Sequence, residues 1–366
     1  MTDTEVVVVG GGVVGLACAA QIARAGRSVC VIERHHKMGM ATSTHNSGVV
    51  HAGLYYPTGS LKAQFCVEGA ARLFSFCAAH RVPHDRCGKL VVAENDDEVP
   101  VIESIAKRAC ANGVDGLEIV DRRFIEAREP AIAAVAALWS PLTGRVEPEA
   151  LVAALLRIVE AHDAVVLPGT QVIGGSPTPD GFELRTDHEL ITTRVVVNAA
   201  GLYADELSAA LDGEPFTIFP CRGEYAELRK SRAHWVNGLV YPVPHASGHG
   251  LGVHLTKTLN GHVLLGPTAR FQDRKEDYES NRFAIEDFLE PARALLPKVT
   301  LEDLVEGGTG IRPKLHPPSE SFADFMVRPD QKHPVLIHAA GIESPGLTAC
   351  LSIGARVSTL TADALS

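Results

Sequence analysis

The N-terminal segment of the chain joins two apolar runs through a glycine-rich break and an apolar, alanine-rich stretch. Glu5–Val9 is almost entirely valine, which is typical of a strand buried on both faces of a parallel sheet. Val13–Ala25 predicts a helix that Gly26 ends, and Ser28–Ile32 predicts a second strand. The pattern therefore predicts a strand–helix–strand unit at the start of the chain.

Further elements follow from the same periodicities. Residues 60–80 carry apolar positions at helical spacing, and the other predicted helices are Val101–Asn112, Glu149–His162, Leu202–Leu211, Ser280–Leu296 and Leu347–Leu360. Residues 215–268 are rich in strand-forming patterns, and the remaining predicted strands are Ala164–Leu167, Thr170–Gly174, Gly181–Thr186, Arg194–Asn198 and Val335–Ala340. No internal repeat is visible along the chain.

The glycine-rich break has the form Gly-x-Gly-x-x-Gly. Gly10 permits the tight turn, Gly12 lets backbone amides approach a pyrophosphate, and Gly15 lets helix and strand pack closely. Glu33 ends the second strand, where an acid binds a ribose hydroxyl. A glycine-rich turn without a ligand is the alternative, and the flanking strand, helix and acid argue against it.

The Gly-x-Gly-x-x-Gly motif alone fits the binding of either FAD or NAD. FAD is favoured because the motif begins at residue 10 and no second such unit follows for a nicotinamide. Val197–Gly201 repeats a strand-to-glycine turn, which indicates a second edge of the same domain. The later glycines Gly248, Gly250 and Gly252 precede no helix and predict only a loop.

Nucleotide-type segments thus lie at the start, middle and end of the chain, with strand-rich insertions between them. We expect an α/β fold in which a discontinuous Rossmann-type FAD-binding domain carries an α+β substrate domain built on an antiparallel sheet, also discontinuous. The predicted FAD-binding domain comprises residues 1–80, 145–212 and 304–366. The predicted substrate-binding domain comprises residues 81–144 and 213–303.

Composition narrows the class of protein. The chain has 366 residues, 46% of them hydrophobic, and a formal net charge of −10, which disfavours nucleic acid as a partner but permits a small anionic substrate. None of its eight cysteines forms a Cys-x-x-Cys pair, as expected for reduced, mostly buried thiols in a reducing compartment. No apolar stretch reaches the length of a transmembrane segment, so we expect a cytoplasmic protein.

Several blocks of sequence carry a family resemblance. They are Thr44–Tyr56, Cys87–Leu90, Arg222–Tyr225, Leu251–Thr256 and Gly341–Thr348. Together they resemble the FAD-dependent L-2-hydroxyglutarate dehydrogenase/oxidase family, part of the D-amino-acid-oxidase-like flavoproteins, almost from end to end. The chain departs from the family at Cys221, Thr268 and Ala269–Ser280, all in the predicted substrate domain.

The resemblance implies FAD as the cofactor and assigns residues to it. Ser43 and Thr44 would meet its phosphates, Asn46–Val49 would pass the flavin ring, Val172 would contact adenine, and the Gly341–Thr348 turn would close over the isoalloxazine. With the glycine motif, the expected cofactor-binding residues are Gly10, Gly12, Val13, Val14, Gly15, Glu33, Arg34, Ser43, Thr44, Asn46, Ser47, Gly48, Val49, Val172, Ala200, Gly201, Gly310, Arg312, Gly341, Glu343, Ser344, Gly346, Leu347 and Thr348.

Two residues are the candidate catalytic groups. His51 follows the flavin-flanking segment, and its imidazole can accept a hydroxyl proton; the alternative is a histidine satisfied within the core or a loop. Arg312 is a candidate clamp for a substrate carboxylate, and its alternative is a structural pairing with an acid such as Glu306.

The expected substrate-binding residues are Arg222, Tyr241, His254 and Ser344. Each has a structural alternative: Glu224 can neutralise Arg222, Tyr241 and His254 can be half-buried strand residues, and Ser344 can cap a helix. Tyr55 and Tyr56 are expected to pack in a turn. The spacing of His245, His249 and His254 argues against a metal site, and a serine-hydrolase motif is missing.

The favoured function is oxidation of a small 2-hydroxy acid, first among them L-2-hydroxyglutarate, to the 2-oxo acid by hydride transfer to flavin N5. Three alternatives stay open: an amine or amino-acid oxidase on the same scaffold, a non-catalytic flavin-binding electron-relay protein, and a plain NAD dehydrogenase. The sequence does not identify the electron acceptor, which can be oxygen, a quinone or a protein. A quinone would imply peripheral contact with the inner face of the membrane, although no strongly basic amphipathic helix is evident.

Overall fold

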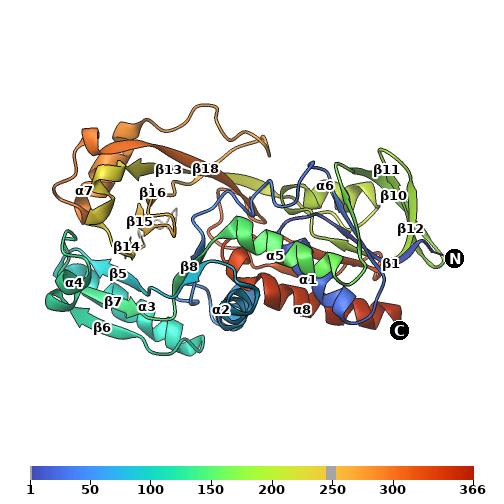
Figure 1. The fold of residues 1–366 in the computed structure, drawn as a ribbon, viewed down its shortest axis with the longest axis horizontal. Coiled ribbons are helices and arrows are strands. Elements are labelled where there is room, and N and C mark those ends of the chain that lie inside the picture. The colour runs from blue at the N-terminus through green and yellow to red at the C-terminus, as the bar shows by residue number, and fades with distance from the viewer. Residues whose placement is uncertain (1, 245–252) are drawn as a thin grey trace.

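The computed structural model describes residues 2–244 and 253–366, and two large sheets dominate it. An eight-stranded sheet with its helices forms the right half of Figure 1, and a nine-stranded sheet extends to the left. Both chain termini lie at the outer end of the eight-stranded half (Figure 1). His245, His249, Gly248, Gly250 and Gly252 lie outside the described residues.

The eight-stranded sheet has a parallel centre. Val7 of β1 faces Cys30 of β2 on one side and Val196 of β12 on the other, both in parallel register. The predicted strand–helix–strand unit is therefore confirmed. The strands of this sheet are β1 (Thr4–Val9), β2 (Val29–Glu33), β9 (Val165–Pro168), β10 (Val172–Thr178), β11 (Gly181–Thr186), β12 (Leu190–Asn198), β19 (Met326–Pro329) and β20 (Leu336–Ala340).

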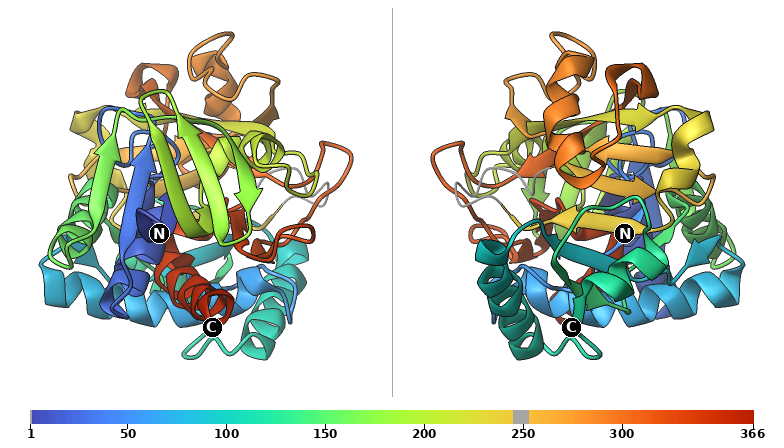
Figure 2. Two further views of the ribbon diagram at one scale, coloured as in Figure 1. Left: turned by 90° about the vertical axis from the view of Figure 1, so that its right-hand side faces the viewer. Right: turned by 90° about the vertical axis from the view of Figure 1, so that its left-hand side faces the viewer.

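Both faces of this sheet are covered, which explains the continuous valine run. Val6 and Val8 pack into a core with the helices α1 (Val13–Arg24), α2 (Leu61–His80), α5 (Pro148–Glu160) and α8 (Gly346–Leu365). Val7 and Val9 point to the opposite face, where α6 (Ala204–Ala210) covers them. In Figure 2 (left) the sheet stands above the C-terminal helix.

The nine-stranded sheet is mostly antiparallel and wraps a second apolar core. Its strands are β5 (Lys89–Ala93), β6 (Glu118–Asp121), β7 (Ala136–Ser140), β13 (Phe219–Leu228), β14 (Leu239–Pro242), β15 (His254–Lys257), β16 (Val263–Gly266), β17 (Arg270–Phe271) and β18 (Leu304–Lys314). The helices α3 (Val99–Ala111), α4 (Arg122–Arg128) and α7 (Leu289–Leu295) accompany it, and a small third sheet contains β3 (Val49–Val50), β4 (His84–Asp85) and β8 (Gly144–Val146).

The long antiparallel pair of β13 and β18 joins the two halves (Figure 1). Its register sets Cys221 opposite Arg312 and Gly223 opposite Gly310. Because alternate residues of a strand share a face, Cys221 and Gly223 present one surface, while Arg222 between them points to the other. This pair therefore brings the end of β18 to the boundary between the sheets.

One predicted helix is wrong over its first part. Ser280–Leu296 is helical only as a 3₁₀ turn at Ile285–Phe288 followed by α7. The preceding residues are held in another conformation because the Glu224 carboxylate accepts a hydrogen bond from the backbone N–H of Phe283 at 2.8 Å, and Asn281 adopts a positive φ of 52°. Distant contacts override local helix propensity here.

Other boundaries shift without changing the architecture. The predicted helix Leu202–Leu211 begins as a 3₁₀ turn (Gly201–Tyr203) before α6, and the last helix continues to Leu365. Further 3₁₀ turns lie at Asp96–Glu98, Lys230–Trp235 and Leu301–Asp303. All eight cysteines are unpaired, and most are buried. Within residues 2–244 and 253–366, no helix combines the length and apolarity needed to cross a membrane.

Candidate active site

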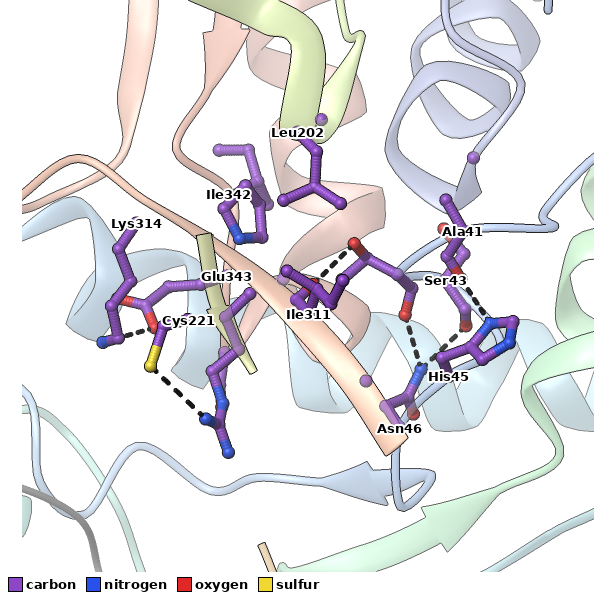
Figure 3. Close-up of a pocket in the computed structure, with 18 of the residues that line it drawn as sticks. Ala41, Ser43, His45, Asn46, Leu202, Cys221, Ile311, Lys314, Ile342 and Glu343 are labelled. Atoms are coloured by element: carbon purple, nitrogen blue, oxygen red, sulfur yellow. Dashed lines mark hydrogen bonds and ion pairs between the residues drawn. The ribbon is translucent and has the colours of Figure 1, made fainter. Parts of the chain in front are cut away.

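A large cavity of about 1180 Å³ runs along the boundary between the two sheets. One arm reaches the carboxyl ends of β1 and β2, the position at which open α/β sheets bind ligands. The other arm passes β13 and β18 and ends at the turn before α8. Figure 3 shows Ala41, Ser43, His45 and Asn46 on one side of the cavity, with Lys314 and Glu343 on the other.

The first arm is formed by the glycine motif. Gly10 has a φ of +116°, and a Cβ there would collide with the backbone of Ala199. A Cβ on Gly12 would lie 2.8 Å from the Ser43 hydroxyl, which itself accepts a hydrogen bond from the Val13 N–H at 2.9 Å. The α1 N-terminus therefore opens on the cavity with the Ser43 hydroxyl beside it, an arrangement suited to an anionic diphosphate.

Glu33 is the last residue of β2, as the sequence predicts, and its carboxylate already has partners within the protein. It accepts hydrogen bonds from the N–H groups of Gly11 at 2.7 Å and His35 at 2.9 Å. These two bonds fix the turn between β1 and α1 and the exit of β2. The acid thus shapes the motif while also lining the cavity.

Five of the expected cofactor residues lie outside the cavity lining. They support its shape instead: Gly15 packs against Gly10, the Thr44 hydroxyl donates to the Gly39 carbonyl at 2.6 Å, and Gly48 and Gly341 occupy turns at φ of +68° and +66°. Thr348 accepts a hydrogen bond from the backbone N–H of His51 at 3.0 Å. All the other expected cofactor residues line the cavity.

His51 lies at the cavity wall, between α8 and α2. Its Nε2 lies 3.3 Å from the Ser344 hydroxyl, and the Cys66 thiol donates to its carbonyl at 3.4 Å. Burial lowers the pKa of His51 to about 3, and the positive charge of Lys89 acts in the same direction. The imidazole is therefore unprotonated at physiological pH, and an anionic substrate bound beside it would raise this pKa and so strengthen the imidazole as a base.

Arg312 lies in the second arm, and no acidic residue within 2–244 and 253–366 pairs with it. Among the described residues, its guanidinium has only the Thr268 carbonyl at 3.3 Å and the Cys221 sulfur at 4.0 Å as hydrogen-bond partners. The alternative pairing with Glu306 does not occur; Glu306 lies within ion-pair distance of Arg282 instead. An unpaired guanidinium in a half-buried cavity is suited to a carboxylate ligand.

The prediction that Arg222 binds substrate is wrong. Its side chain is 2% exposed, lies off the cavity, and pairs with Glu224 at 3.0 Å. It also donates to the carbonyls of Asp277 and Asn281, at 3.2 Å and 3.3 Å. The strand alternation that turns Cys221 and Gly223 to the cavity turns Arg222 into the protein.

Tyr241 and His254 both line the cavity, with their rings stacked 3.5 Å apart. Behind them lies Lys89, whose ammonium is 4.5 Å from the ring of Tyr241 and 4.9 Å from that of Tyr55. Lys89 is 1% exposed, and in the described part of the chain its ammonium finds no hydrogen-bond partner. Burial lowers its pKa to about 7.

Sequence reasoning missed several cavity residues. Tyr55 and Tyr56, expected only to pack in a turn, line the cavity, and the Tyr56 hydroxyl bonds to Ser344. Lys62 and Lys314 line it too, and both pair with Glu343. The signal available in the sequence was the placement of Lys314 two residues after Arg312, a spacing that puts both side chains on one face of a strand.

A cluster of potential metal ligands lies away from this cavity. Glu214, Asp330 and His338 converge, but Arg328 binds the Glu214 carboxylate through two nitrogens, at 2.5 Å and 2.7 Å. Asp330 accepts from His338 and from three backbone N–H groups. The atoms that could bind a metal already form hydrogen bonds and ion pairs within the protein, so we interpret the cluster as a structural hydrogen-bond network.

Comparison with known proteins identifies the family. The FAD dependent oxidoreductase (DAO) family matches residues 5–360. This chain is a member of the FAD-dependent oxidoreductases. The cofactor of the family is therefore FAD, and the open α1 N-terminus and the cavity beside it fit that cofactor.

Within the FAD-dependent oxidoreductases, the resemblance to L-2-hydroxyglutarate dehydrogenases is confirmed. The chain is 34% identical to the mitochondrial L-2-hydroxyglutarate dehydrogenase of Arabidopsis thaliana, over 96% of this chain and 82% of that one. It is 30% identical to L-2-hydroxyglutarate dehydrogenase of Escherichia coli K12, over 96% and 92%.

Solved structures agree on the fold. FAD-bound L-α-glycerophosphate oxidase from Mycoplasma pneumoniae matches with a TM-score of 0.88 and 26% identity, covering 98% of this chain and 94% of that one. Glycine oxidase from Geobacillus kaustophilus matches with a TM-score of 0.85 at 20% identity, covering 99% and 95%. The second likeness concerns the fold alone.

The segment after β17 forms ion pairs with the eight-stranded half of the protein beside the first arm of the cavity. Lys275 pairs with Asp205 at 2.6 Å and with Glu206 at 2.8 Å, and Glu276 pairs with Arg34. The Arg34 guanidinium also lies 3.8 Å from the centre of the Tyr203 ring. Because Arg34, Tyr203, Lys275 and Glu276 all line the cavity, these pairs form part of its wall at the first arm.

We predict that Lys275→Met speeds the release of FAD by about three- to tenfold, because the variant loses two charged hydrogen bonds, one of them exposed at Glu206. The rate at which FAD fluorescence appears on dilution measures this. Lys332→Met, which removes a surface lysine paired with Asp212, is the matched control. Equal release rates in the two variants would show that the segment does not retain the cofactor.

Lys89 supports a prediction about stability and pH. Its pKa is about 7 in the folded protein against 10.5 when exposed, so the unfolded chain binds an extra proton between these values. Stability therefore rises with pH across that window, and the cost of the buried ammonium is fully present below pH 7. Lys89→Met should raise the free energy of unfolding at pH 6 by about 2 to 5 kcal/mol.

Thermal unfolding of the Lys89→Met holoenzyme at several pH values is the measurement. The gain in Tm should be largest near pH 6 and shrink toward pH 10, where the wild-type amine is largely neutral in the folded protein. A gain that does not vary with pH would assign the effect to packing instead of charge.

Proposed function

We propose that this protein oxidises L-2-hydroxyglutarate to the corresponding 2-oxo acid. The observation that carries the proposal is the presence, in one cavity, of a neutral histidine and of an arginine for which the described part of the chain offers no acidic partner. A 2-hydroxy acid requires both a proton acceptor for its hydroxyl and a cation for its carboxylate. The relatives named L-2-hydroxyglutarate dehydrogenase support the choice of acid.

The proposed roles follow the geometry. His51 accepts the hydroxyl proton, and it is held by Thr348 at its backbone and by Ser344 at its Nε2. Arg312 binds the carboxylate next to the reacting carbon, and the stacked rings of Tyr241 and His254 form another part of the cavity wall. When bound, FAD supplies the two-electron oxidation of that carbon.

We propose that FAD is held by those residues of five segments that line the cavity. The segments are the glycine motif, Ser43, Asn46–Val49, Val172 with Gly201, and the turn before α8. We also propose the division of the chain into an FAD-binding part (1–80, 145–212 and 304–366) and a substrate-binding part (81–144 and 213–303). A cytoplasmic location stays a prediction, as does peripheral membrane contact, and the electron acceptor is to be determined by assay.

The test is the visible spectrum of the purified protein under anaerobic conditions. Addition of L-2-hydroxyglutarate should bleach the oxidised flavin rapidly, while the D-enantiomer should leave it oxidised. A protein that is reduced by amino acids but not by hydroxy acids would overturn the proposed substrate and favour an amine-oxidising activity. A protein that no small acid reduces would instead be an electron-relay protein.

A further inference from the structure

Two lysines pair with one buried carboxylate at the end of the second arm of the cavity, where β13 and β18 pass. Glu343, in the turn before α8, receives the Lys62 ammonium of α2 at Oε1 and the Lys314 ammonium of β18 at Oε2, each at 2.8 Å. Figure 3 shows Lys314 beside Glu343. Burial alone would raise the pKa of Glu343, but the two lysines outweigh it and lower the pKa to about 2. The three side chains therefore carry a net charge of +1.

The two lysines are not equivalent. Lys62 is buried, and the rings of Phe322 and Phe325 lie 5.2 Å and 5.4 Å from its ammonium. Lys314 is half-buried, and its only other close partner among the described residues is His316 Nε2 at 3.4 Å. Because an ammonium has three N–H donors, Lys314 keeps donor capacity toward the cavity. Lys62 and Glu343 thus hold Lys314 in place.

Arg312 lies next to this group. Arg312 and Lys314 are two residues apart on β18 and share a face, about 6.6 Å apart along the strand. Arg312, Lys314 and Lys62 are three cations, and Glu343 is the buried carboxylate that pairs with two of them, so these four side chains carry a net charge of +2. Glu320 also lies at the cavity, but it is exposed at the rim, where solvent screens its charge.

We propose that Lys314, held by Glu343 and Lys62, binds the second carboxylate of a dicarboxylate substrate while Arg312 binds the first. The inference rests on the proposed function for the assignment of Arg312. Its physical basis is charge matching: the two negative charges of a dicarboxylate compensate the net charge of +2 in this arm, whereas a monocarboxylate leaves a net charge of +1 there. Lys314 is then the residue that selects a diacid over a monoacid of equal length.

The test compares glutarate with pentanoate, which differ only in the second carboxylate. Each is titrated into the oxidised holoenzyme, and binding is followed by the shift in the flavin absorption spectrum. The wild type should bind glutarate at least tenfold more tightly than pentanoate. Lys314→Met should lose about ten- to a hundredfold in glutarate affinity and change pentanoate affinity by less than twofold. Lys314→Arg should retain most of the preference.

A variant that weakens both ligands equally, or neither, would overturn the subsite. Lys332→Met, away from the cavity, should bind both as the wild type does. If Lys314→Met fails to retain FAD, Lys314→Gln takes its place in the same comparison. Glutarate carries no hydroxyl, so its binding is independent of turnover. Failure of L-2-hydroxyglutarate to bleach the flavin would overturn the proposed function, whereas a wild type without a glutarate preference would overturn the subsite.

Discussion

His51→Gln is expected to slow the reduction of the bound flavin by L-2-hydroxyglutarate about 10²- to 10⁴-fold, with FAD still bound. The range is that of a lost general base. Glutamine can keep the hydrogen bond to Ser344 but cannot accept the hydroxyl proton. Anaerobic stopped-flow bleaching measures the rate, and the absorption spectrum before mixing reports the FAD content.

The pH dependence gives this prediction a second readout. Because burial lowers the pKa of His51 to about 3, the wild-type imidazole is unprotonated throughout the neutral range. Protonation of His51 should therefore reduce the rate only as the pH falls toward 3. His188→Gln, on an exposed loop, is the matched control and should reduce at the wild-type rate. If His51→Gln retained a fifth of that rate, another group would be the base.

The first arm of the cavity could be predicted from the sequence because the residues that shape it lie close together in the chain. Gly10, Gly12 and Glu33 lie within one strand–helix–strand unit, and each conformational requirement falls on the residue that meets it. The valine alternation in β1 likewise follows from burial on both faces. Here the short-range pattern and the final structure express the same physical constraint.

The second arm of the cavity could not be predicted in the same way because the residues that contact one another there lie far apart in the sequence. Lys62 reaches Glu343 across 281 positions, and the burial of Lys89 depends on the strands that pair on either side of β5. Arg222 and Arg312 are indistinguishable as sequence letters, and only the β13–β18 register decides which one faces the cavity. Side-chain direction on paired strands is a tertiary property, so sequence could name the candidates but could not choose between them.

Arg312→Ala is the second prediction with a large expected effect. It should raise the KM for L-2-hydroxyglutarate about 30- to 1000-fold, because the substrate carboxylate loses a charged, two-pronged partner in a half-buried cavity. FAD should remain bound, since the glycine motif and the α1 N-terminus are untouched. Steady-state kinetics with a saturable electron acceptor, together with the flavin content, provide the measurement.

Position as well as charge should matter for Arg312, and Gly223 allows the two to be separated. A Cβ at residue 223 would lie 2.8 Å from the Arg312 Nη2 and 2.9 Å from the Pro267 Cβ, so Gly223→Ala displaces the guanidinium without removing it. Arg312→Lys keeps the positive charge but loses the paired N–H donors of the guanidinium. Arg312→Lys and Gly223→Ala should therefore both have KM values between those of the wild type and Arg312→Ala. Unchanged kinetics in Arg312→Ala would remove the residue from the site, whereas a loss in Arg312→Ala that Arg312→Lys fully restores would reduce its role to that of a point charge.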